Sequence, residues 1–442
     1  MSARLWVALL VAVLVAGCGA PGEDAPEPDG GERTEAKVDV SKAGPVTLTV
    51  WDQEVRGGQR RQIETLNAQF QAKYPNVTIK RVAKSFTDLN TTLKLAVSGD
   101  RAPDVVQANQ GRQVMGTLVK GGLLRPLDEY ADAYGWGDRY APVLLDLNRF
   151  SSDGATFGDG ELYGVSQMGE IVGLFYNRDM VPEPPRTFEE LEQQLAAAEE
   201  RGDVPISFGN LDKWPGIHEF QAVQNTYAPA DQVRDFVFGR DGAAFTTPEN
   251  EEAAAKLQEW AEAGYFTKNF NGVGYDPAYQ QFADGAGPFL IAGTWLLRDL
   301  TDRMGDNVGF MLVPPAEEGG DAQSLGGESL PFAITAKSGN PDVAAAYIDF
   351  LTDANASGVL VRTGNLPAMP ATEEPSSAAG KDVFEAWRTL ADADGLVPYL
   401  DYATPTFYDT ITAGVQQLMA GRQTPSEFTD GLQGDFEKFT GG

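Results

Sequence analysis

The amino-acid sequence predicts an α/β protein with two or more lobes and a parallel sheet in its folded part. Three observations lead to this fold class. The chain has 442 residues and is longer than one typical domain. Its 42% apolar and 22% charged residues allow a large buried core. Apolar runs with the period of a strand alternate with runs that have the period of a helix, and this order produces parallel strands joined by right-handed crossovers.

The first three predicted strands should form the parallel sheet. Residues 46–50 alternate between apolar and polar side chains, and apolar runs follow at 77–79 and 103–107. Two helical stripes connect them, namely Ile63, Leu66 and Phe70, then Leu89, Leu93 and Val97. Ligands of parallel sheets bind beyond the carboxyl ends of the strands. The residues expected there are 51–54 and 109–112, among them Trp51, Asp52, Glu54, Asn109 and Arg112.

The rest of the chain continues with strands and helices of ordinary length. We expect strands at residues 206–210, 287–291, 309–313 and 332–334. We expect helices from residue 187, at 253–264, 279–284, 296–303 and 341–351, and a mostly helical tail at 384–440. Trp295 stands at the end of one strand as Trp51 does at the end of the first, so aromatic side chains recur where strands end.

Residues 163–177 contain a carboxylate within an apolar segment. Two apolar runs, 163–165 and 171–176, flank the polar and flexible residues 166–170, which end with Glu170. A carboxylate in a buried segment needs a partner. Two interpretations stay open from the residues alone. Glu170 lies on a solvated surface turn, or it contacts a ligand at a crossing between two lobes.

Charge and composition exclude several classes of function. The formal net charge is -30 and the pI about 4.3, so the body of the protein would repel a nucleic acid or an anionic membrane surface. A single cysteine, Cys18, excludes internal disulfides and cysteine zinc clusters, and a single histidine, His218, excludes multi-histidine metal sites. No cofactor or metal is therefore predicted, and carboxylates, amides and aromatic rings remain as functional groups.

The N-terminus has the features of a lipoprotein signal. Arg4 precedes an apolar run at residues 5–16, which is too short to span a bilayer and has the length of a signal-peptide core. The run closes on the sequence VAGC, which resembles the bacterial lipoprotein processing site and ends at Cys18. We expect residues 1–17 to be removed and Cys18 to be acylated, which anchors the chain to a membrane. Residues 18–44 should form a disordered tether because they are rich in Gly, Pro, Asp and Glu.

A series of segments after residue 44 occurs in an informative order. The segments are VTLTVWDQ, KYPNVTI, APDVVQ, LYGV, GLFYNRDMVPEPPRTFEEL, FADGAGPFLIAGTW, VGFMLVP, GGESLPFAITAKSGNPDVAAAYIDFL and TGNLPAMP. No single segment is specific, but their order behind a lipoprotein signal is. In this order the chain resembles the extracellular solute-binding proteins of ABC importers, the large family that includes maltose-binding protein.

The resemblance implies a two-lobe periplasmic-binding-protein fold of the type II-like class. Each lobe would be a mainly parallel sheet flanked by helices, and hinge motion at the connections would close the lobes around a ligand. Matching along the sequence places three hinge crossings, at about residues 167–170, 325–332 and 364–370. The expected lobes are residues 45–167 with 332–364, and residues 168–331 with 365–442.

The resemblance also implies a function. A lipid-anchored protein on the extracytoplasmic face of the cell membrane would capture a carbohydrate, with an oligosaccharide expected. It would deliver this ligand to the permease subunits of an ABC transporter. The protein is expected to act as a monomer and without catalysis.

Single residues receive roles from the same resemblance. Glu170 matches the position whose carboxylate hydrogen-bonds a sugar hydroxyl, and Trp295 matches the aromatic residue that stacks on a sugar ring. Trp214 lies in the loop where the family supplies a second aromatic side chain. The second crossing contributes Gly327 and Glu328.

The loops at the strand ends match with some departures. The family's first binding loop corresponds to Trp51, Asp52 and Glu54. Asn109 and Arg112 match the loop after the third strand, but Ala108 replaces an aromatic residue of maltose-binding protein and Gly111 replaces a carboxylate. These departures argue against maltose itself. The further aromatic side chain expected in the C-terminal region is Tyr402, with Tyr399 and Phe407 as alternatives.

Other functions remain to be weighed against sugar binding. Sugars present apolar C–H faces and a rim of hydroxyls, which suit aromatic, carboxylate, amide and guanidinium side chains, although the tryptophans could also be core residues. Carboxylates with aromatic rings would also bind a cation such as a polyamine. A lipid-anchored glycoside hydrolase would need two carboxylates that flank a bond, and the sequence marks no such pair. Nucleophile-elbow and phosphate-loop motifs are missing too, so an enzyme is not expected.

Overall fold

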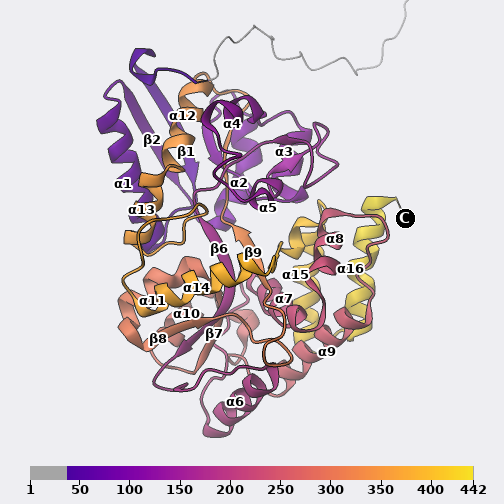
Figure 1. The fold of residues 1–442 in the computed structure, drawn as a ribbon. Helices are drawn as coiled ribbons and strands as arrows, with labels where there is room; N and C mark the ends of the chain where they lie inside the picture. The colour runs from indigo at the N-terminus through magenta and orange to yellow at the C-terminus, as the bar shows by residue number, and fades with distance from the viewer. Residues whose placement is uncertain (1–36, 442) are drawn as a thin grey trace, which may run out of the picture. The chain divides into compact units, whose positions relative to one another are not determined.

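The computed structural model describes residues 37–441, whose strands fall into two larger sheets (Figure 1). We call the elements built around these sheets lobe 1 and lobe 2. The predicted signal peptide and Cys18 lie outside the described residues. Within residues 37–441, no helix is both long and apolar enough to cross a membrane.

Lobe 1 contains a sheet with the strand order β10-β3-β1-β2. Its strands are β1 (Val46–Asp52), β2 (Val77–Ala83), β3 (Val105–Gln107) and β10 (Phe332–Ile334). β1 pairs in parallel with β2 and β3, which confirms the predicted arrangement of the first three strands, whereas β10 is antiparallel to β3. The carboxyl ends of β1 and β3 therefore lie at the same edge of the sheet.

The helices of lobe 1 bury the apolar stripes that the sequence predicted. The six side chains of the two stripes are at most 1% exposed. The helices are α1 (Gly57–Lys73), α2 (Phe86–Ser98), the π-helix η2 (Arg112–Gly116), α3 (Thr117–Lys120), α4 (Asp128–Tyr134), α5 (Pro142–Asp146), α12 (Pro341–Leu351) and α13 (Ala354–Thr363). A small antiparallel pair adds β4 (Arg149–Phe150) and β5 (Glu161–Leu162).

Lobe 2 contains a mixed sheet. Its strands are β6 (Gly169–Asn177), β7 (Phe289–Gly293), β8 (Val308–Met311), β9 (Ser324–Glu328) and β11 (Leu396–Val397). β6 is antiparallel to β7, β8 and β9, and only β9 and β11 pair in parallel. The expected mainly parallel sheet is therefore wrong for lobe 2. The reason for the β6–β9 pair is that β6 leads from lobe 1 into lobe 2 and β9 leads back toward lobe 1.

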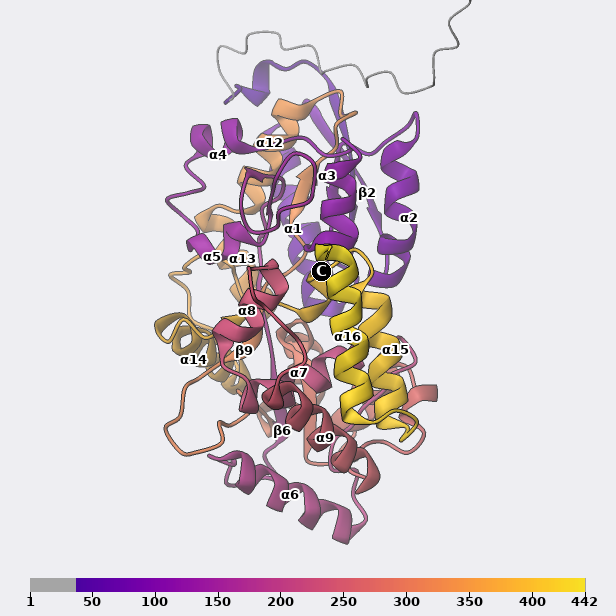
Figure 2. The ribbon, with the colours of Figure 1, turned by 90° about the vertical axis from the view of Figure 1, so that its right-hand side faces the viewer.

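Helices surround this sheet, and the long C-terminal helices run next to one another (Figure 2). They are α6 (Phe188–Arg201), α7 (Pro215–Tyr227), α8 (Ala230–Phe238), α9 (Pro248–Glu262), α10 (Tyr275–Ala283), α11 (Leu297–Met304), α14 (Ala378–Asp392), α15 (Phe407–Met419) and α16 (Pro425–Thr440). Short 3-10 turns are η1 (Val40–Lys42), η3 (Phe270–Gly272), η4 (Thr294–Leu296), η5 (Gly305–Asn307) and η6 (Leu400–Tyr402).

One expected strand, residues 206–210, does not form. Ile206 makes only isolated parallel bridges, to Phe266 and Phe289. Two residues later the backbone N–H of Phe208 donates to the side-chain hydroxyl of Thr267 at 3.0 Å. A side chain thus takes the place of the main-chain partner that a strand would need.

Three segments run side by side between the lobes. The start of β6 pairs with the end of β9. The N–H of Gly169 donates to the carbonyl of Leu366, and the N–H of Ala368 to the carbonyl of Gln167, each at 3.0 Å. These hydrogen bonds join the third segment to the first. The three segments coincide with the predicted crossings, and the lobe boundaries within them stay a prediction.

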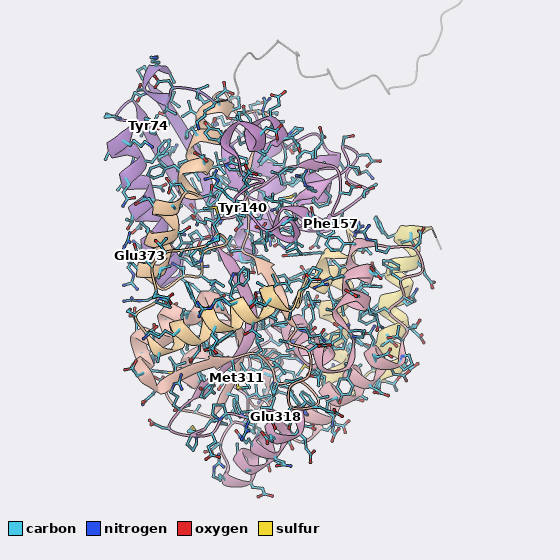
Figure 3. The ribbon with its side chains drawn as sticks, viewed as in Figure 1. Tyr74, Tyr140, Phe157, Met311, Glu318 and Glu373 are labelled. Carbon is cyan, nitrogen blue, oxygen red and sulfur yellow. The ribbon has the colours of Figure 1, made fainter. Side chains whose placement is uncertain are left out.

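The two lobes are in contact in this structure. Figure 3 labels Tyr140 and Phe157 on the side of lobe 1 that faces the crossings and lobe 2. The hydroxyl of Tyr140 donates to the carbonyl of Ser166 at 2.6 Å, and the ring of Phe157 lies 5.0 Å from that of Phe238 in lobe 2. The structure therefore shows the lobes closed on one another.

The end of the predicted tether belongs to lobe 1. Val40 is 2% exposed, and the side-chain amide of Asn76 donates to the carbonyls of Val40 at 2.8 Å and Gly44 at 2.9 Å. The expectation of a disordered tether up to residue 44 is therefore wrong for residues 40–44. A buried valine and the two hydrogen bonds from Asn76 fix this segment.

Candidate functional site

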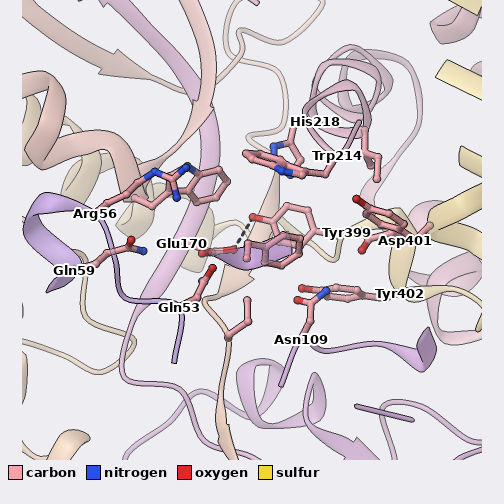
Figure 4. Close-up of a pocket in the computed structure, with 15 residues that line it drawn as sticks. Gln53, Arg56, Gln59, Asn109, Glu170, Trp214, His218, Tyr399, Asp401 and Tyr402 are labelled. Atoms are coloured by element: carbon pink, nitrogen blue, oxygen red, sulfur yellow. Dashed lines mark hydrogen bonds between the residues drawn. The ribbon is translucent and has the colours of Figure 1, made fainter. Parts of the chain in front are cut away.

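A cavity lies between the two lobes, beside the crossing segments. Its empty space is about 630 Å³, part of it open to solvent. The lining residues, most of them labelled in Figure 4, are Gln53, Arg56, Gln59, Phe86, Asn109, Glu170, Trp214, Ile217, His218, Trp295, Leu330, Tyr399, Asp401, Tyr402 and Tyr408.

Five of the sequence-predicted residues line this cavity although they come from distant parts of the chain. Asn109 follows β3, Glu170 lies in β6, Trp214 precedes α7, Trp295 follows β7 within η4, and Tyr402 ends η6. Strand ends and helix starts thus converge where the two lobes meet. Of the two alternatives to Tyr402, Tyr399 also lines the cavity, whereas Phe407 is fully buried in the core.

Glu170 provides a buried carboxyl group at the centre of the cavity wall. It is 9% exposed and sits in β6 opposite Gly327 of β9, so the interpretation as a solvated surface turn is wrong. The hydroxyl of Tyr399 donates to its Oε1 at 3.0 Å (Figure 4). Burial raises the pKa of Glu170 to about 8, and the nearby carboxylate of Glu54 adds to this effect. Glu170 therefore carries a proton at neutral pH and can both donate and accept a hydrogen bond.

Aromatic rings cover one wall of the cavity. Trp214 and Trp295 lie 6.2 Å apart in a T-shaped arrangement, and the ring of Tyr275 lies 4.4 Å from Trp214. The indole N–H of Trp295 donates to the hydroxyl of Tyr275 at 2.8 Å, which fixes its orientation. Both tryptophans are only partly buried. Core tryptophans of this chain differ in this respect, since Trp136 and Trp260 are at most 1% exposed.

His218 extends the same wall. Its ring lies 5.6 Å from Trp295 and 5.3 Å from Tyr399. Burial lowers the pKa of His218 to about 3, so the ring is neutral at physiological pH. In the sequence, His218 served only to exclude multi-histidine metal sites, and no role in the cavity was predicted for it. Its position at the start of a helix gave no signal that it faces a cavity.

Lobe 1 contributes a polar end to the cavity, formed by Gln53, Arg56 and Gln59 (Figure 4). The guanidinium of Arg56 donates to Asp276 of lobe 2 at 2.8 Å, but its Nε has no hydrogen-bond partner among residues 37–441. The side-chain oxygen of Gln59, a residue that is 3% exposed, also has none. Buried polar atoms are almost always hydrogen-bonded, so these atoms are suited to a ligand or water.

The end of β1 and the loop after it, residues 51–54, were expected to carry ligand contacts, and one of these four residues lines the cavity. Gln53 lines the cavity, whereas Asp52 and Glu54 are fully buried and point into lobe 1. Arg81 donates to both carboxylate oxygens of Asp52, at 2.7 and 2.6 Å, and the amide of Gln107 donates to Glu54 at 2.7 Å. Successive side chains of an extended segment point to opposite faces, so one residue decides between the core and the cavity.

The other predicted residues also lie outside the cavity lining. The ring of Trp51 stacks under the ammonium of Lys84 at 4.7 Å. Gly327 packs closely in β9, where an added Cβ would lie 2.7 Å from a methyl group of Leu147. Glu328 accepts a hydrogen bond from Asn148, and burial raises its pKa to about 8. The side chain of Arg112 donates to main-chain carbonyls of both lobes.

Among residues 37–441, no group of three or more histidine, cysteine, aspartate or glutamate side chains is arranged to hold a metal ion. The chemistry of the cavity therefore consists of aromatic faces, two carboxyl groups, amides and one guanidinium. This set can bind a polar ligand that also has apolar faces.

Comparisons with known proteins agree with this fold. Residues 65–391 match the family described as bacterial extracellular solute-binding protein. The chain is 26% identical over 387 residues to the maltodextrin-binding protein MdxE of Bacillus subtilis (strain 168), covering 84% of this chain and 83% of that protein. It is 22% identical over 395 residues to a maltooligosaccharide ABC transporter solute-binding lipoprotein of Streptococcus pneumoniae serotype 4, covering 86% and 83%. A solved chitin oligosaccharide binding protein shares the two-lobe fold, with a TM-score of 0.76, 23% identity, and 90% of this chain and 100% of that chain covered.

Proposed function

Because the chain belongs to the bacterial extracellular solute-binding proteins, we propose that it captures a carbohydrate between its lobes and delivers it to an ABC importer. The observation that carries this proposal is the cavity, which combines partly exposed tryptophan faces with a buried, protonated carboxyl group. Aromatic faces suit the C–H faces of a sugar ring. A protonated Glu170 can pair with a hydroxyl as donor or acceptor.

The names of the relatives support the same ligand class. The names mention maltodextrin, maltooligosaccharide and chitin oligosaccharide, and each belongs to a protein that this chain resembles over most of its length. The shared chemistry is a neutral oligosaccharide. We propose this class as the ligand.

A polyamine fits the cavity less well. The guanidinium of Arg56 lines the cavity and would repel a cation. Burial raises the pKa of Glu170 to about 8 and that of Asp401 to about 7, so neither carboxyl group is fully ionised at neutral pH. A polycation would thus meet one fixed positive charge and two weakly charged partners.

We propose that the protein binds its ligand without converting it. Glu170 and Asp401 both line the cavity, so the alternative of a glycoside hydrolase has a direct test. Labelled oligosaccharides incubated with the protein should be recovered intact. Shorter labelled products would contradict the assignment as a binding protein.

The proposed location follows from the N-terminus. We propose that acylated Cys18 holds the mature chain as a monomer on the extracytoplasmic face of the membrane. One of the relatives is named a solute-binding lipoprotein, which supports this proposal. The residues between Cys18 and the folded part would let the lobes reach membrane partners.

A thermal-shift screen tests the proposed ligand class. Neutral oligosaccharides such as maltotriose and chitotriose should raise the melting temperature, because a ligand at a hundred times its Kd stabilises the folded state by about 2.7 kcal/mol. Spermidine and putrescine should leave it unchanged. Stabilisation by the polyamines alone would overturn the carbohydrate assignment, and calorimetric titration of each hit would give the affinity.

A further inference from the structure

Arg112 joins the two lobes next to the cavity. It comes from η2 of lobe 1, and its Nη1 donates to the carbonyls of Val237 at 2.8 Å and Ala403 at 2.7 Å. Its Nη2 donates to the carbonyl of Phe238 at 3.0 Å. These three acceptors belong to lobe 2. A fourth, weaker contact at 3.4 Å joins Nε to the carbonyl of Ala155 within lobe 1.

The guanidinium is enclosed from both sides. Arg112 is 4% exposed, and its Cζ lies 5.5 Å from the ring centre of Phe157 in lobe 1 and 4.9 Å from that of Phe439 in lobe 2. Val237 and Phe238 are the last residues of α8, so the cation sits at the negative end of that helix. Hydrogen bonds from a charged donor in such a dry environment are stronger than those in water.

The main chains of the two lobes approach closely beside Arg112. Gly111 has φ +77°, and a Cβ there would lie 2.5 Å from the Cα of Tyr402 in lobe 2. A Cβ on Gly158 of lobe 1 would lie 2.6 Å from the ring of Phe238. Glycine at both positions permits this contact. Tyr402 also lines the cavity, so the contact surface and the candidate ligand site share a residue.

We propose that Arg112 is a latch that holds the lobes closed around the bound ligand. This inference rests on the proposed function, in which a ligand is enclosed between the lobes. When the lobes separate, the hydrogen bonds between the guanidinium and the carbonyls at the ends of α8 and η6 break, and these groups become hydrated. The three cross-lobe hydrogen bonds thus exist only in the closed state and shift the equilibrium toward it.

The latch would act on affinity without touching the ligand. The apparent Kd of a ligand rises in proportion as the closed, binding-competent state becomes less populated. Arg112 is then a positioning residue, because it also holds the carbonyl of Ala403, the residue after Tyr402. Arg112, which the sequence predicted to contact the ligand, would thus support the ligand site without touching the ligand.

A lobe-crossing arginine outside the cavity lining provides a matched control. Arg61 of α1 pairs with Asp302 of α11 at 3.1 Å, with side chains that are 47% and 49% exposed. Exposed ion pairs contribute little because both partners stay hydrated and salt screens them. Arg61→Ala removes a cross-lobe arginine contact without removing a buried one.

The experiment measures maltotriose and chitotriose binding to purified wild type, Arg112→Ala, Arg112→Lys, Phe439→Ala and Arg61→Ala. Arg112→Ala should weaken the affinity for the sugar that binds wild type by roughly ten- to a hundredfold, mainly through faster dissociation. Arg112→Lys, which keeps the charge but loses the fork of donors, and Phe439→Ala should have smaller effects in the same direction. Arg61→Ala should bind like wild type.

The unliganded melting temperature separates a latch from a structural role. For a latch, the loss of sugar affinity should exceed any loss of unliganded stability, whereas loss of a purely structural arginine would lower the unliganded melting temperature and leave affinity unchanged. Wild-type affinity in Arg112→Ala would overturn the inference, as would an equal loss in Arg61→Ala.

Failure of wild type to bind either sugar would count against the proposed function. In that case a measurement of the distance between the lobes still tests the latch. Spin labels at Leu95→Cys in lobe 1 and Leu211→Cys in lobe 2, in a Cys18→Ser background, use two side chains that are 80% and 59% exposed. Arg112→Ala should lower the population with the closed-state distance. An unchanged distance distribution would overturn the latch.

Discussion

The closure of the lobes should be coupled to the protonation of Glu170. The usual pKa of a glutamate is 4.5, and burial between the lobes raises that of Glu170 to about 8. In separated lobes, water reaches this carboxyl group and its pKa should return toward the usual value. Closing therefore takes up a proton in the window between these two values, and closure is favoured at low pH.

The magnitude follows from the shift of the pKa. One unit corresponds to about 1.4 kcal/mol, so holding Glu170 ionised within the closed lobes would cost roughly 5 kcal/mol. The protein avoids this cost by binding a proton. The advantage of the closed state is fully present below about pH 4.5 and is lost as the pH rises through 8. Within this window sugar affinity should fall by up to about tenfold per pH unit.

Calorimetric titration in buffers with different ionisation enthalpies measures this proton directly. Wild type should take up close to one proton more per sugar bound at pH 7 than Glu170→Gln, which keeps the shape and is neutral at every pH. Burial also raises the pKa of Glu54, Glu328 and Asp401. These groups are present in both proteins, so the difference reports the proton of Glu170 together with its electrostatic coupling to Glu54 and Glu328. Equal proton uptake in the two proteins would refute the coupling.

Three further predictions follow from the same structure. Trp295→Ala should weaken sugar affinity about five- to a hundredfold in calorimetry, with little loss of the unliganded melting temperature, whereas a core tryptophan would cost about 3–5 kcal/mol of stability. Asp52→Ala leaves Arg81 without its buried carboxylate and should lower stability by roughly 3 kcal/mol in denaturant unfolding, and unchanged stability would show that the pair is dispensable. Cys18→Ser should release the protein from the membrane fraction, and retention with acyl labelling intact would disprove the anchor.

The sequence by itself identified the local features of the site. Glu170 stood out as a carboxylate within an apolar segment, and Trp295 as an aromatic residue at the end of a buried strand. Both line the cavity because the directions of β6 and β7 are set by apolar runs that must be buried. Burial of a strand is a property of its own residues, so sequence periodicity predicts where the strand ends.

Arg56 and Gln59, two residues of the polar end of the cavity, were missed for a physical reason. Gln59 lies in the first turn of α1, where glutamine is an ordinary residue of an exposed helix. Gln59 is nevertheless buried, and lobe 2 approaches this helix start, where Gly57 and Gly58 lie close to Asp299 and Arg298 of α11. No pattern within α1 reports the position of a partner that is more than two hundred residues away in the chain.

The loop after β3 shows most clearly what the sequence predicts and what only the tertiary structure decides. Asn109 and Arg112 lie three residues apart, and both were predicted to contact a ligand. The structure turns the chain at Gly111, which has φ +77°, so that Asn109 lines the cavity and Arg112 enters a dry site formed by α8, η6 and α16 of lobe 2. The sequence determined that this loop carries polar side chains at the end of a strand. Only the tertiary structure decided which of them meets the cavity and which meets the other lobe, because the acceptors of Arg112 are main-chain carbonyls whose positions no residue type specifies.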